Sequence, residues 1–151
     1  MLRGIASYML PSAAGTNPAL IGAVPIWVKV GSVPYTSFQT AATTNSITLF
    51  SLIAAGIIHE TKIKHSVAFS GAAIASVTVS VGISGTNDKY ASAFDVLQAV
   101  SATAFELSDS LGSESHTAAT NITITAVSSG TNLSALSAGS VDVWAKLSVA
   151  N

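Results

Sequence analysis

The sequence predicts an all-β protein, an antiparallel β-sandwich built from two facing sheets. Several segments alternate apolar and polar residues, as strands with one buried face do. Turn sequences rich in Gly, Asn and Ser separate these segments, and no segment has the caps of a long helix. The seven or eight strands that result fit one domain of 151 residues. An eight-stranded jelly roll is the leading prediction, and an immunoglobulin-like sandwich is the alternative.

Residues 1–25 are predicted to be an extended N-terminal arm, followed by the β-sandwich domain at residues 26–151. Repeated prolines and glycines argue against regular structure in the arm. A terminal arm becomes ordered when something holds it, so we expect it to bind a partner or a neighbouring copy. The alternative is that it packs on its own domain. The expected contact residues are Leu2, Arg3, Ile5, Tyr8, Leu10, Leu20 and Ile21.

The first two strands are predicted at Ile26–Val30 and Ser46–Leu52. Apolar residues recur at every second position in Ile26–Val30, which is the spacing of one strand face. A loop that contains Pro34 and a polar stretch separates the two strands. The small residues Ala54–Gly56 then predict a turn.

The stretch Ile57–Ile83 is predicted to form the central hairpin of the core. Gly71, in the connector Ser70–Ala73, should supply the turn because glycine adopts a positive φ at little cost. The outward face of the first strand should hold Lys62, Lys64 and Ser66. The expected inward residues are Thr61, Ile63, His65, Val67 and Phe69 in the first strand, and Val77, Val79, Val81 and Ile83 in the second.

The next segment begins with a turn at Ser84–Asp88 and continues into an ambiguous region. Phe94–Phe105 fits either a helical turn or a strand, and we favour a strand with an irregular middle because its neighbours are strands. A polar loop is expected at Asp109–Thr120.

The last two strands are predicted at Asn121–Ser128 and Val141–Val149, with a loop of small residues at Leu133–Ser140 between them. The order of strand, Ser-Gly-Thr-Asn turn and second strand in Ile122–Val143 echoes Val77–Val96. A sandwich of two similar halves would produce this echo, and so would chance.

The composition restricts the classes of partner. Charged residues are 9% of the chain, against roughly 25% in ordinary soluble domains. Because interface cores are depleted in charge, this composition favours a protein whose surface is covered by other subunits. Net charge is −1 and the cations are scattered, which argues against nucleic acid. The chain has no apolar run long enough to span a bilayer, so we expect no membrane association.

No group of residues predicts catalysis, a metal site or a cofactor. His59 and His65 lie on one strand face about 20 Å apart, too far to share an ion. Ser, Glu and His crowd together in Gly112–His116, but neighbours in a loop rarely adopt the geometry of a catalytic triad. The carboxylates show no spacing that singles out a pair. Four aromatic residues could form a sugar-binding platform, although core or interface packing is the favoured interpretation: Trp27, Tyr35, Phe38 and Trp144.

The region from about Val33 onward resembles small structural proteins of tailed bacteriophages. The residues that carry this resemblance are Ile57–Phe69, Val77–Gly85 and Tyr90–Val100. The resemblance implies a virion component, most simply a head decoration (cement) protein on the capsid surface and not an enzyme. Such a protein would form a homo-oligomer, a trimer rather than a dimer, and would bind neighbouring subunits of the major capsid protein. The alternative is a carbohydrate-binding or host-attachment module of a phage fibre or tail.

Overall fold

The computed structural model describes residues 24–100, 105–107 and 116–149. Within them the chain forms eight strands, the short helix α1 (Tyr35–Phe38) and a 3₁₀ turn at Leu133–Ala135. The predicted arm contacts Leu2, Arg3, Ile5, Tyr8, Leu10, Leu20 and Ile21 lie outside the described residues. The strands are β1 (Ile26–Pro34), β2 (Thr44–Leu52), β3 (Gly56–Gly71), β4 (Ser76–Ile83), β5 (Thr86–Asp95), β6 (Phe105–Leu107), β7 (Thr120–Ser129) and β8 (Leu136–Val149).

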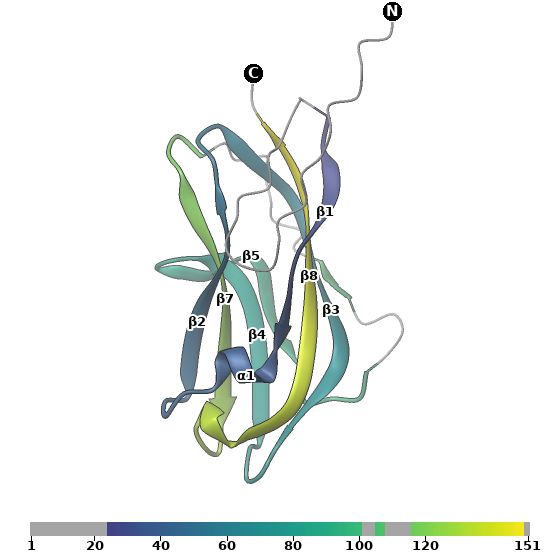
Figure 1. The fold of residues 1–151 in the computed structure, drawn as a ribbon, viewed down its shortest axis with the longest axis vertical. Helices are drawn as coiled ribbons and strands as arrows, with labels where there is room; N and C mark the ends of the chain where they lie inside the picture. The colour runs from purple at the N-terminus through teal and green to yellow at the C-terminus, as the bar shows by residue number, and fades with distance from the viewer. Residues whose placement is uncertain (1–23, 101–104, 108–115, 150–151) are drawn as a thin grey trace, which may run out of the picture.

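The eight strands form two four-stranded antiparallel sheets that face each other, so the predicted β-sandwich is confirmed (Figure 1). The first sheet has the order β1-β8-β3-β6 and the second has the order β2-β7-β4-β5. The neighbouring pairs β1–β8, β2–β7, β3–β6 and β4–β5 are those of one long antiparallel ribbon that has been rolled up. This order supports the jelly-roll prediction.

The core lies between the two sheets and is filled from the inward positions of both. In β4, Val77, Val79 and Val81 are fully buried, as the alternation predicts. Phe38 of α1 fills one end of the core beside Phe69, with 6.1 Å between the ring centroids. Each apolar side chain of this size contributes about 1.5–3 kcal/mol when it leaves water. The sandwich is therefore held mainly by the apolar contents of these inner faces.

The prediction of a hairpin at Ile57–Ile83 is wrong. β3 pairs with β8 and β6 in the first sheet, whereas β4 pairs with β7 and β5 in the second. The connector between them therefore carries the chain from one sheet to the other. Two strands that each have one apolar face can lie side by side or face each other across a core. The alternation of residues is the same in both arrangements.

The predicted inward position of Val67 is also wrong, because this side chain is 51% exposed. The register of β3 against β8 shifts between His65 and Val67, where His65 pairs with Val141 and Val67 pairs with Ser140. Such a β-bulge inserts one residue, disrupts the ladder locally and bends the strand. The register shifts again between Val67 and Ser70, and Phe69 is buried as predicted. Up to the bulge, the predicted facing of β3 is confirmed.

Gly71 does not take the positive φ that was predicted for it. The left-handed residue in this connector is Ala73, with φ 60°. Glycine is required at position 71 for space: a Cβ atom there would lie 2.5 Å from both the carbonyl oxygen of Ala135 and Cδ1 of Ile74. A close backbone approach explains this glycine.

The predictions for the later elements are partly confirmed. The turn after β4 is shorter than expected, because Gly85 takes φ 85° and β5 begins at Thr86. In the described part of the segment Phe94–Phe105, which is residues 94–100 and 105, strand structure occurs where β5 ends at Asp95 and where β6 begins at Phe105. The loop predicted at Leu133–Ser140 is wrong from Leu136 onward, where β8 starts.

The two segments that share a sequence echo are not equivalent in the structure. The first Ser-Gly-Thr-Asn sequence joins β4 to β5, which pair within the second sheet. The second joins β7 in the second sheet to β8 in the first. The echo therefore reflects similar turn chemistry in two different connections.

Candidate binding surfaces

The outer face of the first sheet gathers aromatic and charged side chains. Strand register places Lys29, Trp144 and Lys62 in one row across β1, β8 and β3. The adjacent rows are Trp27–Lys146–Glu60 and Ser32–Asp142–Lys64. We call this surface the Trp/Lys face; it consists of Trp27, Lys29, Glu60, Lys62, Lys64, Asp142, Trp144 and Lys146.

Two of its four lysines form ion pairs. Lys29 Nζ lies 3.0 Å from Asp142 Oδ1, and Lys146 Nζ donates to Glu60 Oε1 at 2.7 Å. The hydrogen bond from Lys146 lowers the pKa of Glu60. Burial pushes the pKa of Asp142 upward, but the hydrogen bond from Ser32 and the contact with Lys29 outweigh it and lower the pKa. Both carboxylates are therefore ionised and already engaged at neutral pH.

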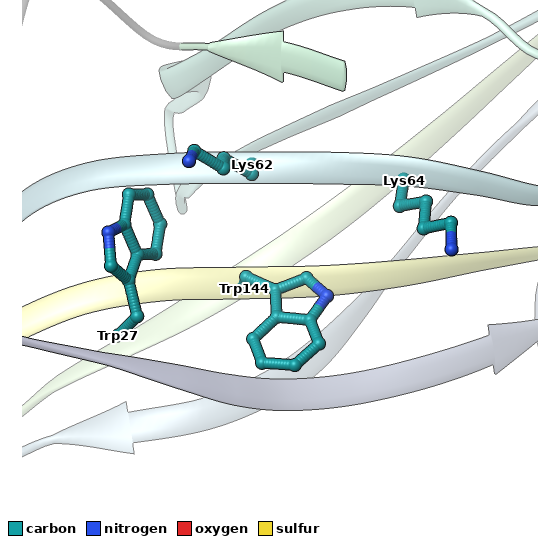
Figure 2. Close-up of a pocket in the computed structure, with 4 residues that line it drawn as sticks. All are labelled: Trp27, Lys62, Lys64 and Trp144. Carbon is teal, nitrogen blue, oxygen red and sulfur yellow. The ribbon is translucent and has the colours of Figure 1, made fainter. Parts of the chain in front are cut away.

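The other two lysines line a shallow pocket with both tryptophans. The pocket has a volume of about 260 Å³ and is lined by Trp27, Lys62, Lys64 and Trp144. Lys62 Nζ lies 4.1 Å from the ring centroid of Trp27, within the range of a cation–π interaction. Figure 2 shows Lys64 extending from β3 toward β8, where Trp144 is located. Strands β1, β3 and β8 thus present an excess of two positive charges on this face.

The outer face of the second sheet has the opposite character. Strands β2, β4 and β7 contain no charged residue, and the charges described in this sheet all belong to the edge strand β5. Ser46 and Thr125 are hydrogen-bonded across β2 and β7, with 2.7 Å between their hydroxyl oxygens. Val127 is 42% exposed on the same face. We call this surface the hydroxyl face; its positions are Thr44, Ser46, Thr48, Thr78, Ser80, Thr123, Thr125 and Val127. Ser80 and Thr125 are themselves buried within it.

The histidines occupy separate places in the described part of the chain. His59 is hydrogen-bonded to the Ser148 hydroxyl at 2.7 Å, and His65 is buried in the core. His116 is hydrogen-bonded to the hydroxyl of Tyr90 near the turn between β2 and β3, where its backbone also bonds to Ala55 and Gly56. No group of three or more metal-ligating side chains forms among the residues described.

The four aromatic residues considered as a sugar platform do not lie together in the structure. Phe38 is fully buried, and Tyr35 packs partly buried against the core. Trp27 and Trp144 lie together on the Trp/Lys face, where Trp27 is 36% exposed. The position of Lys62 and Lys64 beside these tryptophans was not predicted from the sequence. The alternation in β3 did predict that both lysines point outward, and this was the only part of their role that the sequence could indicate.

Neither helix in the described ranges has the length or apolar run needed to cross a bilayer.

Comparison with known proteins identifies similar solved structures. No protein-family model matches the sequence, and no curated protein matches it. A chain of the cyanophage Pam1 capsid asymmetric unit superposes with a TM-score of 0.59 at 23% identity, over 93% of this chain and 98% of that one. The two chains share a fold. A chain of the acid-stable capsid of Helicobacter pylori bacteriophage KHP30 gives a TM-score of 0.39 at 16% identity, over 82% of this chain and 93% of that one, and supports no argument.

Proposed function

We propose that this chain is a virion structural protein, a capsid decoration protein that binds neighbouring major capsid subunits and stabilises the head. The observation that carries the proposal is the fold shared with a chain of a cyanophage capsid asymmetric unit over nearly the full length of both chains. The low content of charged residues supports it, because repeated subunit contacts cover much of such a surface. In this role the protein has no catalytic activity.

The two outer faces suit different contacts in such an assembly. The hydroxyl face fits a contact between copies, because its three uncharged strands can be buried without removing an ion from water. The Trp/Lys face is unsuited to packing against its own copy, because its excess lysines would repel each other. The proposed oligomer is a trimer formed through the hydroxyl face, with the N-terminal arm free to reach the capsid.

Deletion of residues 1–25 tests the role of the arm. We expect the shortened protein to fold, because β1 begins at Ile26 and the core lies in the sandwich. It should no longer co-sediment with capsids that lack the protein, whereas the full chain should. Circular dichroism and thermal unfolding confirm that the shortened domain is folded. A folded, arm-less domain that still decorates capsids would contradict the proposed docking role.

The substitution Val127→Lys tests the contact between copies. It places an ammonium group in the hydroxyl face, and burying an unpaired charge in an interface costs several kcal/mol. We expect the mass in solution, measured by light scattering during size exclusion, to fall to that of a monomer. Val67→Lys is the matched control, because Val67 is also an exposed valine, 51% against 42% for Val127, and it lies on the opposite sheet. The interface lies elsewhere if Val127→Lys keeps the oligomer or if both substitutions dissociate it.

The second candidate is a carbohydrate-binding or host-attachment module of a fibre or tail. The observation that favours it is the pair of tryptophans, Trp27 and Trp144, on the Trp/Lys face. Labelling of whole virions with an antibody distinguishes the two candidates by location. A decoration protein labels the head, and an attachment module labels the tail or its fibres.

A further inference from the structure

We propose that the Trp/Lys face binds an acidic saccharide, with a sugar ring against Trp27 and Trp144 and its carboxylate at Lys62 and Lys64. This site goes beyond the capsid role proposed above, because it requires only the first sheet of a single chain. It would function on a particle or on the free protein.

The geometry of the pocket fits one charged ring. Trp27 and Trp144 are diagonal neighbours on β1 and β8, since Trp27 pairs with Lys146 and Lys29 pairs with Trp144. Diagonal neighbours of this kind are about 7–8 Å apart, within reach of long aromatic side chains. The pocket between them, of about 260 Å³, is slightly smaller than the sites that hold drug-sized ligands. Figure 2 shows the two indoles and the two lysines that line it, with Trp27 beside Lys62 and Trp144 nearer to Lys64.

The charge at the pocket is what selects an acid. The two carboxylates of this face are already paired, Asp142 with Lys29 and Glu60 with Lys146. Lys62 and Lys64 are two residues apart on one face of β3, about 7 Å along the strand. Two flexible ammonium groups at this spacing can reach one carboxylate, and hydrogen bonds between charged groups are the strong ones. A neutral sugar would offer no negatively charged group to these two ammonium groups.

The tryptophans supply the rest of the recognition. An indole offers a broad apolar surface together with one N–H donor, which matches the apolar faces and polar rim of a sugar ring. Lys62 already lies over the ring of Trp27 and helps to hold it in place. Trp144 is held on the central strand β8, between β1 and β3, so its backbone position is fixed by pairing on both sides.

Three other occupants fit less well. A second copy of this face would bring its own excess lysines against these ones. The buried centre of a protein interface is normally depleted in lysine, whereas this face contains four. Nucleic acid binding depends on several phosphate contacts. Among the described residues of this face only Lys62 and Lys64 are outside the ion pairs, and the chain has a net charge of −1.

Intrinsic fluorescence of the full-length protein tests the proposal directly. The chain has two tryptophans, and both belong to this face, so a change in their emission reports this site alone. The acidic probes are trigalacturonate and 3′-sialyllactose, and their neutral counterparts are methyl-esterified trigalacturonate and lactose. We expect a saturable change with at least one acidic probe and binding at least about tenfold weaker to its neutral counterpart.

The double variant Lys62→Gln/Lys64→Gln should weaken binding of the acidic probe at least about tenfold. Lys89→Gln is the control, because it makes the same kind of substitution, for one charge, on β5 in the other sheet and should leave the affinity unchanged. Circular dichroism confirms that each variant is folded.

Four results would overturn the proposal. The first is no fluorescence response to either acidic probe at a concentration on the order of 10 mM, and the second is equal affinity for the acidic and neutral probes. The third is full affinity in the double variant, and the fourth is tighter binding of oligo-dT or hexaglutamate. The last result would assign the face to nucleic acid or to an acidic peptide.

Discussion

Replacing Gly139 with alanine is expected to destabilise the protein by about 3–5 kcal/mol, a large part of the stability of an ordinary domain. Gly139 has φ 132°, which residues with a side chain rarely adopt. An added Cβ would lie 2.3–2.7 Å from three ring atoms of Phe69. That ring is buried between Phe38 and His65, with centroid separations of 6.1 and 6.4 Å, so it has no space into which to move. The free-energy costs of backbone strain and of overpacking against Phe69 therefore add in this variant.

Urea denaturation of the wild type and the Gly139→Ala variant measures this loss. Gly85→Ala is the control, because Gly85 also has a positive φ, of 85°, but an added Cβ would meet nothing within 4 Å. It should cost only the backbone strain, about 1 kcal/mol. Equal losses in the two variants would show that the contact with Phe69 contributes nothing.

The protein is expected to lose stability below about pH 6.5 because His65 must stay neutral in the core. His65 is fully buried, and neither ring nitrogen has a hydrogen-bond partner. Its ring lies against Phe69 and, at 6.1 Å in an edge-on arrangement, against Phe94. Burial lowers the pKa of His65, and the nearby carbonyl groups and Asp95 only partly oppose this shift. The protonated form is thus poorly tolerated by the folded state.

The direction of the pH dependence follows from the lowered pKa of His65. In the unfolded chain this residue titrates near 6.5, so below that pH the unfolded state binds more protons than the folded state. Stability is therefore fully present above about pH 6.5 and declines toward the lowered folded pKa, by up to about 1.4 kcal/mol per pH unit. The carboxyl groups of Glu60 and Asp142, whose pKa values are also lowered, titrate at more acidic pH.

The variant His65→Leu should remove this decline between pH 7 and pH 5. At pH 7.5 we expect it to be at least as stable as the wild type, because it replaces two unpaired buried nitrogens with an apolar group. His59→Gln is the control and should keep the decline, since His59 lies outside the core beside Ser148. Denaturation midpoints across this pH range provide the measurement. An unchanged decline in His65→Leu would assign it to another group.

Much of the fold could be predicted because a strand has a period of two. The alternation placed Lys62 and Lys64 outward and Val77, Val79 and Val81 inward, and the structure confirms each position. The partner of each strand could not be predicted in this way. Alternation determines which face of a strand is buried, but it contains no information about which strand lies beside it. The bulge that exposes Val67 could not be predicted for the same reason, because it depends on the register in which β3 pairs with β8.

The Trp/Lys face illustrates why the candidate site was only partly predictable. Trp27 and Trp144 were candidates for a sugar platform, but so were Tyr35 and Phe38, which lie near Trp27 in the sequence. Cross-strand register, and not closeness in sequence, brings Trp27 and Trp144 next to Lys62. For the arm, the prediction still rests on sequence alone.

The strand order has a consequence for how the chain reaches its folded state. β1 and β2 pair only with β8 and β7 respectively, and those two strands occupy interior positions in their sheets. Neither sheet can therefore acquire all of its strands until residues 120–149 have been synthesised. Contacts between segments so distant in sequence slow folding, and open strand edges before completion favour aggregation. The subunit thus remains incompetent for assembly during most of its translation, and its surfaces form together at the end.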